Sequence, residues 1–129
     1  MAAKYTLQGP GWQDMEFVYG ENWQANFTAA DGQGTTLDIT GATIQFRVST
    51  VAATPVTVAT RTVGDGITIT GAAAGTFSLN MTFAQQSTNN PTAIVEGTRY
   101  LYNTRVTTSG GTVYDQARGH LAVATSLIS

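Results

Sequence analysis

Apolar and polar residues alternate along most of this chain, in short runs separated by Gly, Asp, Asn and Ser. Side chains of a β-strand point alternately to opposite faces, so this period of two is typical of strands with one buried face. The clearest run covers residues 42–48, where Ala42, Ile44, Phe46 and Val48 share one face. Apolar residues at helical spacing are nearly absent. The pattern therefore predicts an all-β protein.

The alternating runs and the breakers between them define the expected strands. The strands are predicted at residues 16–18, 23–28, 37–40, 42–48, 56–62, 67–70, 75–81, 99–108, 112–115 and 119–128. Gly-rich turns within residues 56–81 predict consecutive hairpins there. One helical turn is expected at residues 82–86, with Thr82 as its N-cap. Many short strands at this spacing favour an antiparallel sandwich or barrel.

The first fourteen residues lack the alternation and carry Gly9, Pro10 and Gly11. We therefore expect an extended N-terminal arm over residues 1–14, followed by one domain over residues 15–129. A tryptophan in such an arm has little surface of its own chain to cover, so Trp12 is predicted to dock on a neighbouring subunit. Tyr5 and Pro10 are the other candidate contact residues in the arm.

The charge pattern indicates which kinds of partner to expect. Eight acidic and six basic residues give a net charge of -2, and the basic residues are scattered singly, which disfavours nucleic acid. Only 11% of residues are charged, so the surface must consist largely of hydroxyls, amides and small side chains. Such a surface resists association weakly, which predicts coverage by other subunits, including a homo-oligomer. No apolar run approaches the ~20 residues that span a bilayer, so no membrane anchor is expected.

Residues for ordinary enzyme chemistry are scarce. The chain has no Cys and one His, so we expect no metal site and no cofactor. His120 lies in an alternating run, and we interpret it as a surface strand residue. Asp14 and Glu16 are the only acids two residues apart; they are the one candidate pair for a small hydrolase, and solvated carboxylates are the favoured interpretation. We therefore expect no catalytic residues and no enzymatic activity.

A resemblance to a known family appears at residues 37–48, which read LDITGATIQFRV. The segment is similar to the D-L-T-G-A-T-V-x-F-x-V motif of small immunoglobulin-like bacteriophage virion proteins, including the N-terminal domain of the baseplate upper protein family. Residues 16–23, and residues 100–106 followed by 111–113, are also similar to that group, so the resemblance runs from about residue 15 to the C-terminus. It implies an immunoglobulin-like antiparallel β-sandwich with an extended N-terminal arm.

The same resemblance implies a function. The chain is expected to be a non-enzymatic structural protein of the virion that mediates subunit assembly in the tail or baseplate, as an adaptor or a fibre attachment, with other virion proteins as partners. A capsid decoration protein is the alternative, because no fibre segment follows the domain. A carbohydrate-binding module on the virion is the alternative of another class, although the aromatic residues mostly lie at strand spacing, where they fill a core.

Overall fold

The computed structural model describes residues 5–82 and 97–125, and these residues contain ten β-strands and no helix. The strands are β1 (Tyr5–Gln8), β2 (Gly11–Trp12), β3 (Met15–Val18), β4 (Trp23–Thr28), β5 (Thr43–Thr50), β6 (Thr57–Val63), β7 (Gly66–Gly71), β8 (Thr76–Met81), β9 (Thr98–Thr107) and β10 (Val113–Ala124). Of the helical turn expected at residues 82–86, only Thr82 lies among the described residues. The all-β prediction is confirmed for this part of the chain.

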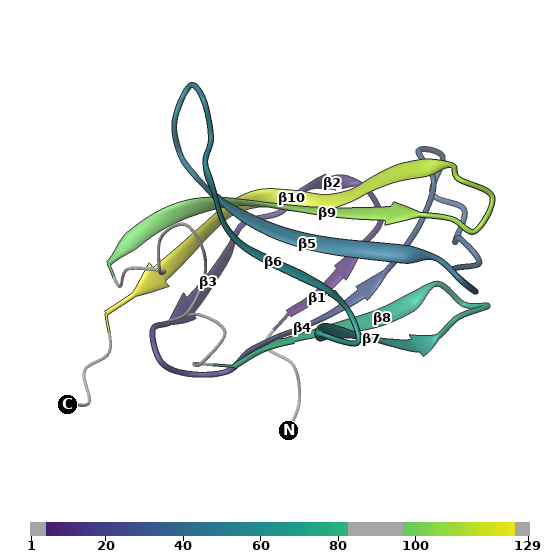
Figure 1. Ribbon diagram of the computed structural model, residues 1–129, viewed down its shortest axis with the longest axis horizontal. Coiled ribbons are helices and arrows are strands. Elements are labelled where there is room, and N and C mark those ends of the chain that lie inside the picture. Colours follow the sequence, from purple (N-terminus) through teal and green to yellow (C-terminus); the bar gives the residue numbers. More distant parts are fainter. Residues whose placement is uncertain (1–4, 83–96, 126–129) are drawn as a thin grey trace.

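The strands form one curled, mixed sheet in the order β1-β4-β8-β7-β6-β5-β9-β10-β2, with β3 also beside β10. Neighbours are antiparallel except for β1 with β4, β6 with β7, and β2 and β3 with β10, which are parallel. The sheet curls so that β6, β5, β9 and β10 form an upper layer over β1, β4, β8 and β7 (Figure 1). The antiparallel pairing expected from the sequence therefore covers most of the sheet, but not all of it.

The strand predicted at residues 37–40 is wrong, although the alternation there does reflect burial. Ile39 is fully buried, but its segment forms no strand. The amide of Leu37 donates to the carbonyl of Ala29 at 3.0 Å, whereas that of Ile39 donates to Ala72 at 2.8 Å. In a β-strand, amides two residues apart bond to the same neighbouring strand; here they reach different parts of the chain, so no ladder forms. Alternation reports which side chains are buried, and a loop that crosses the end of a core can satisfy it.

Two further expectations differ from the structure. Residues 112–115 and 119–128 were predicted as two strands, but the single strand β10 runs through Val113–Ala124 with an irregularity between Asp115 and Arg118. The pair β6–β7 is not a hairpin, since its contacts are parallel, whereas β7 and β8 are antiparallel. The turn after β6 carries the chain from the upper layer to the lower one (Figure 1), so the strands on either side of it diverge.

Aromatic rings join the two layers in the core. Phe27 of the lower layer stacks on Phe77 at 4.9 Å between ring centroids and lies 6.5 Å from Phe46 of the upper layer. Phe46 in turn stacks on Tyr102 at 5.6 Å. All four rings are buried, and aromatic pairs at these distances add to the free energy gained from burial. These rings join the two layers, so the outward side of the upper layer faces away from the core.

Candidate protein interface

The segment predicted as an N-terminal arm is described from Tyr5 onward, and it is paired within the sheet. β1 lies beside β4 in the lower layer, and β2 lies beside β10 in the upper layer. Tyr5 is half-buried; its hydroxyl accepts a hydrogen bond from the amide of Glu16 at 2.7 Å and donates to the carbonyl of Glu16 at 3.0 Å. Its ring packs edge-on against Phe17 at 5.4 Å. Tyr5 therefore ties β1 to β3 inside the chain.

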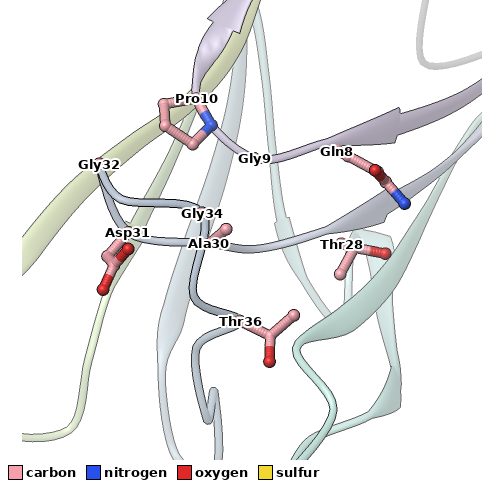
Figure 2. A pocket seen from close by; sticks show the side chains of 9 residues that line it. All are labelled: Gln8, Gly9, Pro10, Thr28, Ala30, Asp31, Gly32, Gly34 and Thr36. Atoms are coloured by element: carbon pink, nitrogen blue, oxygen red, sulfur yellow. The ribbon is translucent and has the colours of Figure 1, made fainter.

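Pro10 is exposed and lines a cavity of about 340 Å³, here called the Pro10 pocket (Figure 2). Its walls are Gln8, Gly9, Pro10, Thr28, Ala30, Asp31, Gly32, Gly34 and Thr36. The Asp31 carboxylate accepts hydrogen bonds from the amides of Gln33 at 2.8 Å and Thr35 at 3.0 Å. In Figure 2 this carboxylate points away from Pro10. The one acidic group of the pocket thus holds the shape of a turn.

Trp12 lies in a different cavity, two residues further along. This cavity, the Trp12 groove, has a volume of about 280 Å³ and is lined by Trp12, Ser49, Pro55, Leu101, Tyr102, Asn103, Asp115 and Arg118. The Trp12 side chain is 56% exposed. Its ring packs edge-on against His120 at 5.2 Å between centroids. One edge of the indole is therefore held in place, and the rest of it is open to a partner.

Backbone contacts hold Trp12 at the rim of the groove. The amide of Gln13 donates to the carbonyl of Arg118 at 2.7 Å, and the Tyr102 hydroxyl donates to the carbonyl of Gln13. Burial, and then the negative charge of Asp14, raise the pKa of the Tyr102 hydroxyl, which keeps it protonated as a donor. A Cβ on Gly119 would lie 2.4 Å from the same Gln13 oxygen. Only a glycine therefore lets this segment approach β10 so closely.

The fold gathers arginines that are scattered in the sequence. Arg47, Arg99, Arg105 and Arg118 are all exposed on β5, β9 and β10, and residues next to them in sequence point into the core. Arg47 lies opposite Asn103 on β9, and Asn103 lies opposite Arg118 on β10. The outward side of β5, β9 and β10, here called the outer face, therefore carries a group of cations that the sequence alone did not show.

An irregularity in β10 is what places two of the charges on this face. Asp115 lies opposite Arg105 and Arg118 lies opposite Asn103, so three steps along β10 match two steps along β9. Without an extra residue, positions 115 and 118 would point to opposite faces. The β-bulge lets both side chains point outward, while Gln116 is buried.

The charges of the outer face are only partly paired. Arg105 donates from Nε to Asp115 Oδ1 at 2.7 Å. This hydrogen bond lowers the pKa of the Asp115 carboxyl and raises the pKa of the Arg105 guanidinium. Gln45, Arg47, Asn103 and Arg105 line a small cavity of about 60 Å³, here called the arginine pocket. Among the described residues, no carboxylate lies within ion-pair distance of Arg47.

The candidate hydrolase pair takes part in local structure. Asp14 Oδ1 accepts a hydrogen bond from the amide of His120 at 2.9 Å, and the imidazole Nδ1 lies 3.8 Å from the same oxygen. Glu16 lies on β3 with its side chain exposed. Neither carboxylate lines the Pro10 pocket or the Trp12 groove. Asp14 thus joins the segment between β2 and β3 to β10.

Residues 5–82 and 97–125 contain neither a metal-ligand cluster nor a candidate membrane-spanning helix. No group of three or more His, Cys, Asp or Glu side chains in these ranges is placed to hold a metal ion. No helix in the same ranges is long and apolar enough to cross a membrane.

Sequence reasoning selected Trp12 and missed Arg47, Asn103, Arg105 and Arg118. The three arginines alternate with apolar residues in or beside their predicted strands, so the sequence already indicates that they are solvated. Their convergence could not be inferred, because it depends on β5 lying beside β9 and on the bulge in β10. The three residues proposed from the sequence are also not one site, since Tyr5 is bound within the chain and Pro10 and Trp12 lie in separate cavities.

Together, these features define an all-β protein with a curled mixed sheet and several arginines on one outward face. No family model matches the chain, and no curated protein matches it. Among solved structures, the chain is similar to the N-terminal domain of phage TP901-1 ORF48, with a TM-score of 0.53 and 12% sequence identity. The alignment covers 96% of this chain and 99% of that domain. A phage protein thus shares the fold across almost the whole chain.

Proposed function

We propose that this chain is a non-enzymatic structural protein of a bacteriophage virion, which mediates subunit assembly in the tail or baseplate. The observation that carries the proposal is the similarity to the N-terminal domain of phage TP901-1 ORF48 over nearly the full length of both chains. The resemblance of residues 37–48 to a motif of phage virion proteins supports the same proposal. A fold alone does not determine function, so the features of the surface matter as well.

The sheet supports an immunoglobulin-like topology as part of this proposal. Each layer has a central pair, β4 with β8 below and β5 with β9 above, and the N-terminal segment contributes strands to both layers. Immunoglobulin-like sandwiches place their strands in two such layers. The parallel pairing of β1 with β4 and the link between β6 and β7 are departures from two separate antiparallel sheets. We interpret the sheet as a variant of the sandwich whose two layers are joined through β6 and β7.

The outer face supports a role in assembly. It presents Trp12, 56% exposed, beside a groove of about 280 Å³. Exposed aromatic residues beside a cavity are frequent anchors of protein interfaces. The loop between β5 and β6 rises above the same face (Figure 1) and carries Val51 and Val56, which are 51% and 47% exposed. These apolar side chains are candidate contacts for a partner that covers the outer face.

Capsid decoration is the alternative location, and carbohydrate binding is the alternative function. A carbohydrate platform needs several accessible rings, whereas Trp12 is the only aromatic side chain classed as exposed among the described residues. The rings of Phe27, Phe46, Phe77 and Tyr102 are buried in the core. The surface therefore favours protein contacts over glycan contacts.

Immuno-electron microscopy of virions tests the proposal. An antibody against the purified chain should label particles at the tail tip in a small, fixed number of positions. Label spread evenly over the shell would assign the protein to capsid decoration. Particles without label, confirmed by absence of the chain in mass spectrometry of purified virions, would contradict a structural role.

A further inference from the structure

We infer that the outer face binds an acidic loop of a partner protein, with one carboxylate in the arginine pocket and an apolar side chain in the Trp12 groove. Asn103 lines both cavities, so they lie side by side on this face. The inference deepens the proposed role in assembly and rests on it, because it states which chemistry the partner presents.

The apolar half of the site has walls from distant parts of the chain. Trp12 comes from β2, Pro55 comes from the loop between β5 and β6, and Leu101 of β9 lies between them in the strand order. The groove has a volume of about 280 Å³, which is enough for one or two aliphatic side chains. Removing such side chains from water favours binding in proportion to the apolar area covered.

The polar half of the site fits a carboxylate. A guanidinium binds a carboxylate through a fork of N–H donors, and Arg47 offers its fork without a partner among the described residues. The arginine pocket holds about 60 Å³, which suits one carboxylate and excludes a sugar or a base. Arg105 already binds Asp115, so it adds positive charge while its position is fixed.

The amide of Asn103 distinguishes a peptide from a simple anion. Its Oδ1 is buried and has no hydrogen-bond partner among the described residues. Buried acceptors are nearly always paired in the functional state of a protein. A peptide supplies a backbone N–H beside each acidic side chain, whereas a phosphodiester supplies no donor. The observations therefore favour an acidic protein segment over nucleic acid.

The test uses the whole ¹⁵N-labelled chain in NMR titrations with short blocked peptides as probes. The acidic probe is Gly-Asp-Leu-Glu-Gly, the neutral isostere is Gly-Asn-Leu-Gln-Gly, and the basic control is Gly-Lys-Leu-Lys-Gly. The acidic probe should shift the Trp12 indole N–H and the Asn103 side-chain amide in a saturable way. The neutral isostere should bind at least about fivefold more weakly, since it forms no charge-assisted hydrogen bond.

Two variants separate a pocket from general electrostatics. Arg47→Gln should weaken binding of the acidic probe about fivefold or more. Arg99→Gln removes the same charge from β9 but lines neither cavity, so it should weaken binding less than about twofold. Both residues are exposed, so both variants should keep the dispersed spectrum of the folded chain. Trp12→Ala should abolish the shifts of the groove, and Trp12→Phe should restore most of them.

Several results would overturn the inference. These are equal binding of the neutral or basic probe, equal losses with Arg47→Gln and Arg99→Gln, and tighter binding of an oligothymidylate than of the acidic probe. If sedimentation shows a dimer, and the same NMR resonances shift with protein concentration, the face would be assigned to a second copy of the chain instead. The virion labelling experiment decides the assembly role separately: labelled particles with no peptide binding would reject only this inference.

Discussion

Gln116 is a buried polar residue whose side chain connects the two layers, and its replacement tests how the fold is closed. Its Oε1 accepts a hydrogen bond from the amide of Ala30 at 2.9 Å, and its Nε2 donates to the carbonyl of Ala30 at 2.9 Å. The side chain is thus a substitute for a backbone pair between the end of β4 and β10. We predict that Gln116→Met lowers the free energy of unfolding by about 3 kcal/mol.

The magnitude follows from the two groups that would lose their partners. Methionine has a similar volume and flexibility, so the substitution creates little cavity. Ala30 is 7% exposed, which gives water little access to its amide and carbonyl. Leaving each group unpaired costs about 1–3 kcal/mol, and burial of the thioether returns about 1 kcal/mol. The net loss of about 3 kcal/mol corresponds to a decrease in Tm of about 10 °C for a domain of this size.

Urea unfolding measures this loss, with the fluorescence of the fully buried Trp23 as the probe and circular dichroism as the check on two-state behaviour. Gln33→Met makes the same chemical change at an exposed position and should alter stability by less than about 0.5 kcal/mol. If Gln116→Met also stays within 0.5 kcal/mol of the parent at an unchanged m-value, the buried amide does not join the layers and the reasoning fails.

Three further changes test other contacts. Gly119→Ala would place a methyl group 2.4 Å from a backbone oxygen and should cost about 2 kcal/mol in urea unfolding, whereas Gly32→Ala, with open space around it, should change stability little. Tyr5→Phe removes two hydrogen bonds to β3, so it should lower the free energy of unfolding by about 1 kcal/mol and speed amide exchange in β1. Unchanged exchange would show that Tyr5 does not hold β1 to β3. The pKa of Asp115 is lowered mainly by the hydrogen bond from Arg105, so the pair stabilises the fold above the unfolded pKa of about 4 and loses this contribution as pH falls. Because the pair is exposed, Asp115→Asn should cost under about 0.5 kcal/mol at neutral pH, and an Asp115 carboxyl that titrates at its ordinary value in NMR would refute the assignment.

The sequence predicted strands well where pairing and burial coincide. β4 has the bounds expected from its alternation, because every second residue of Trp23–Thr28 faces the core. The failures share one cause: alternation records the direction of side chains, whereas a strand also needs a neighbouring backbone. Residues 37–40 have alternating side chains but no neighbouring strand. β1 and β2 have a neighbouring strand but little alternation.

The candidate site was less accessible from the sequence, since it depends on register. Trp12 stood out because a large ring follows three breakers, which is a local property. The meeting of Arg47, Asn103 and Arg118 in one row requires three strands to align, and a bulge sets that alignment. A single extra residue in β10 thus decides whether Arg118 faces solvent or core, and no propensity of the surrounding residues reports it.

The position of the N-terminal segment decides how its role should be tested. Deleting residues 1–12 would remove β1 and β2, including the core residue Leu7, which is 5% exposed, so loss of incorporation could reflect loss of folding. Trp12→Ala removes only a side chain that is 56% exposed and should change the free energy of unfolding by about 1 kcal/mol or less. If Trp12 is an interface anchor, this variant should remain folded and yet fail to enter virions, while Trp12→Phe should enter them. A folded Trp12→Ala protein that is incorporated normally would show that the groove faces solvent in the particle.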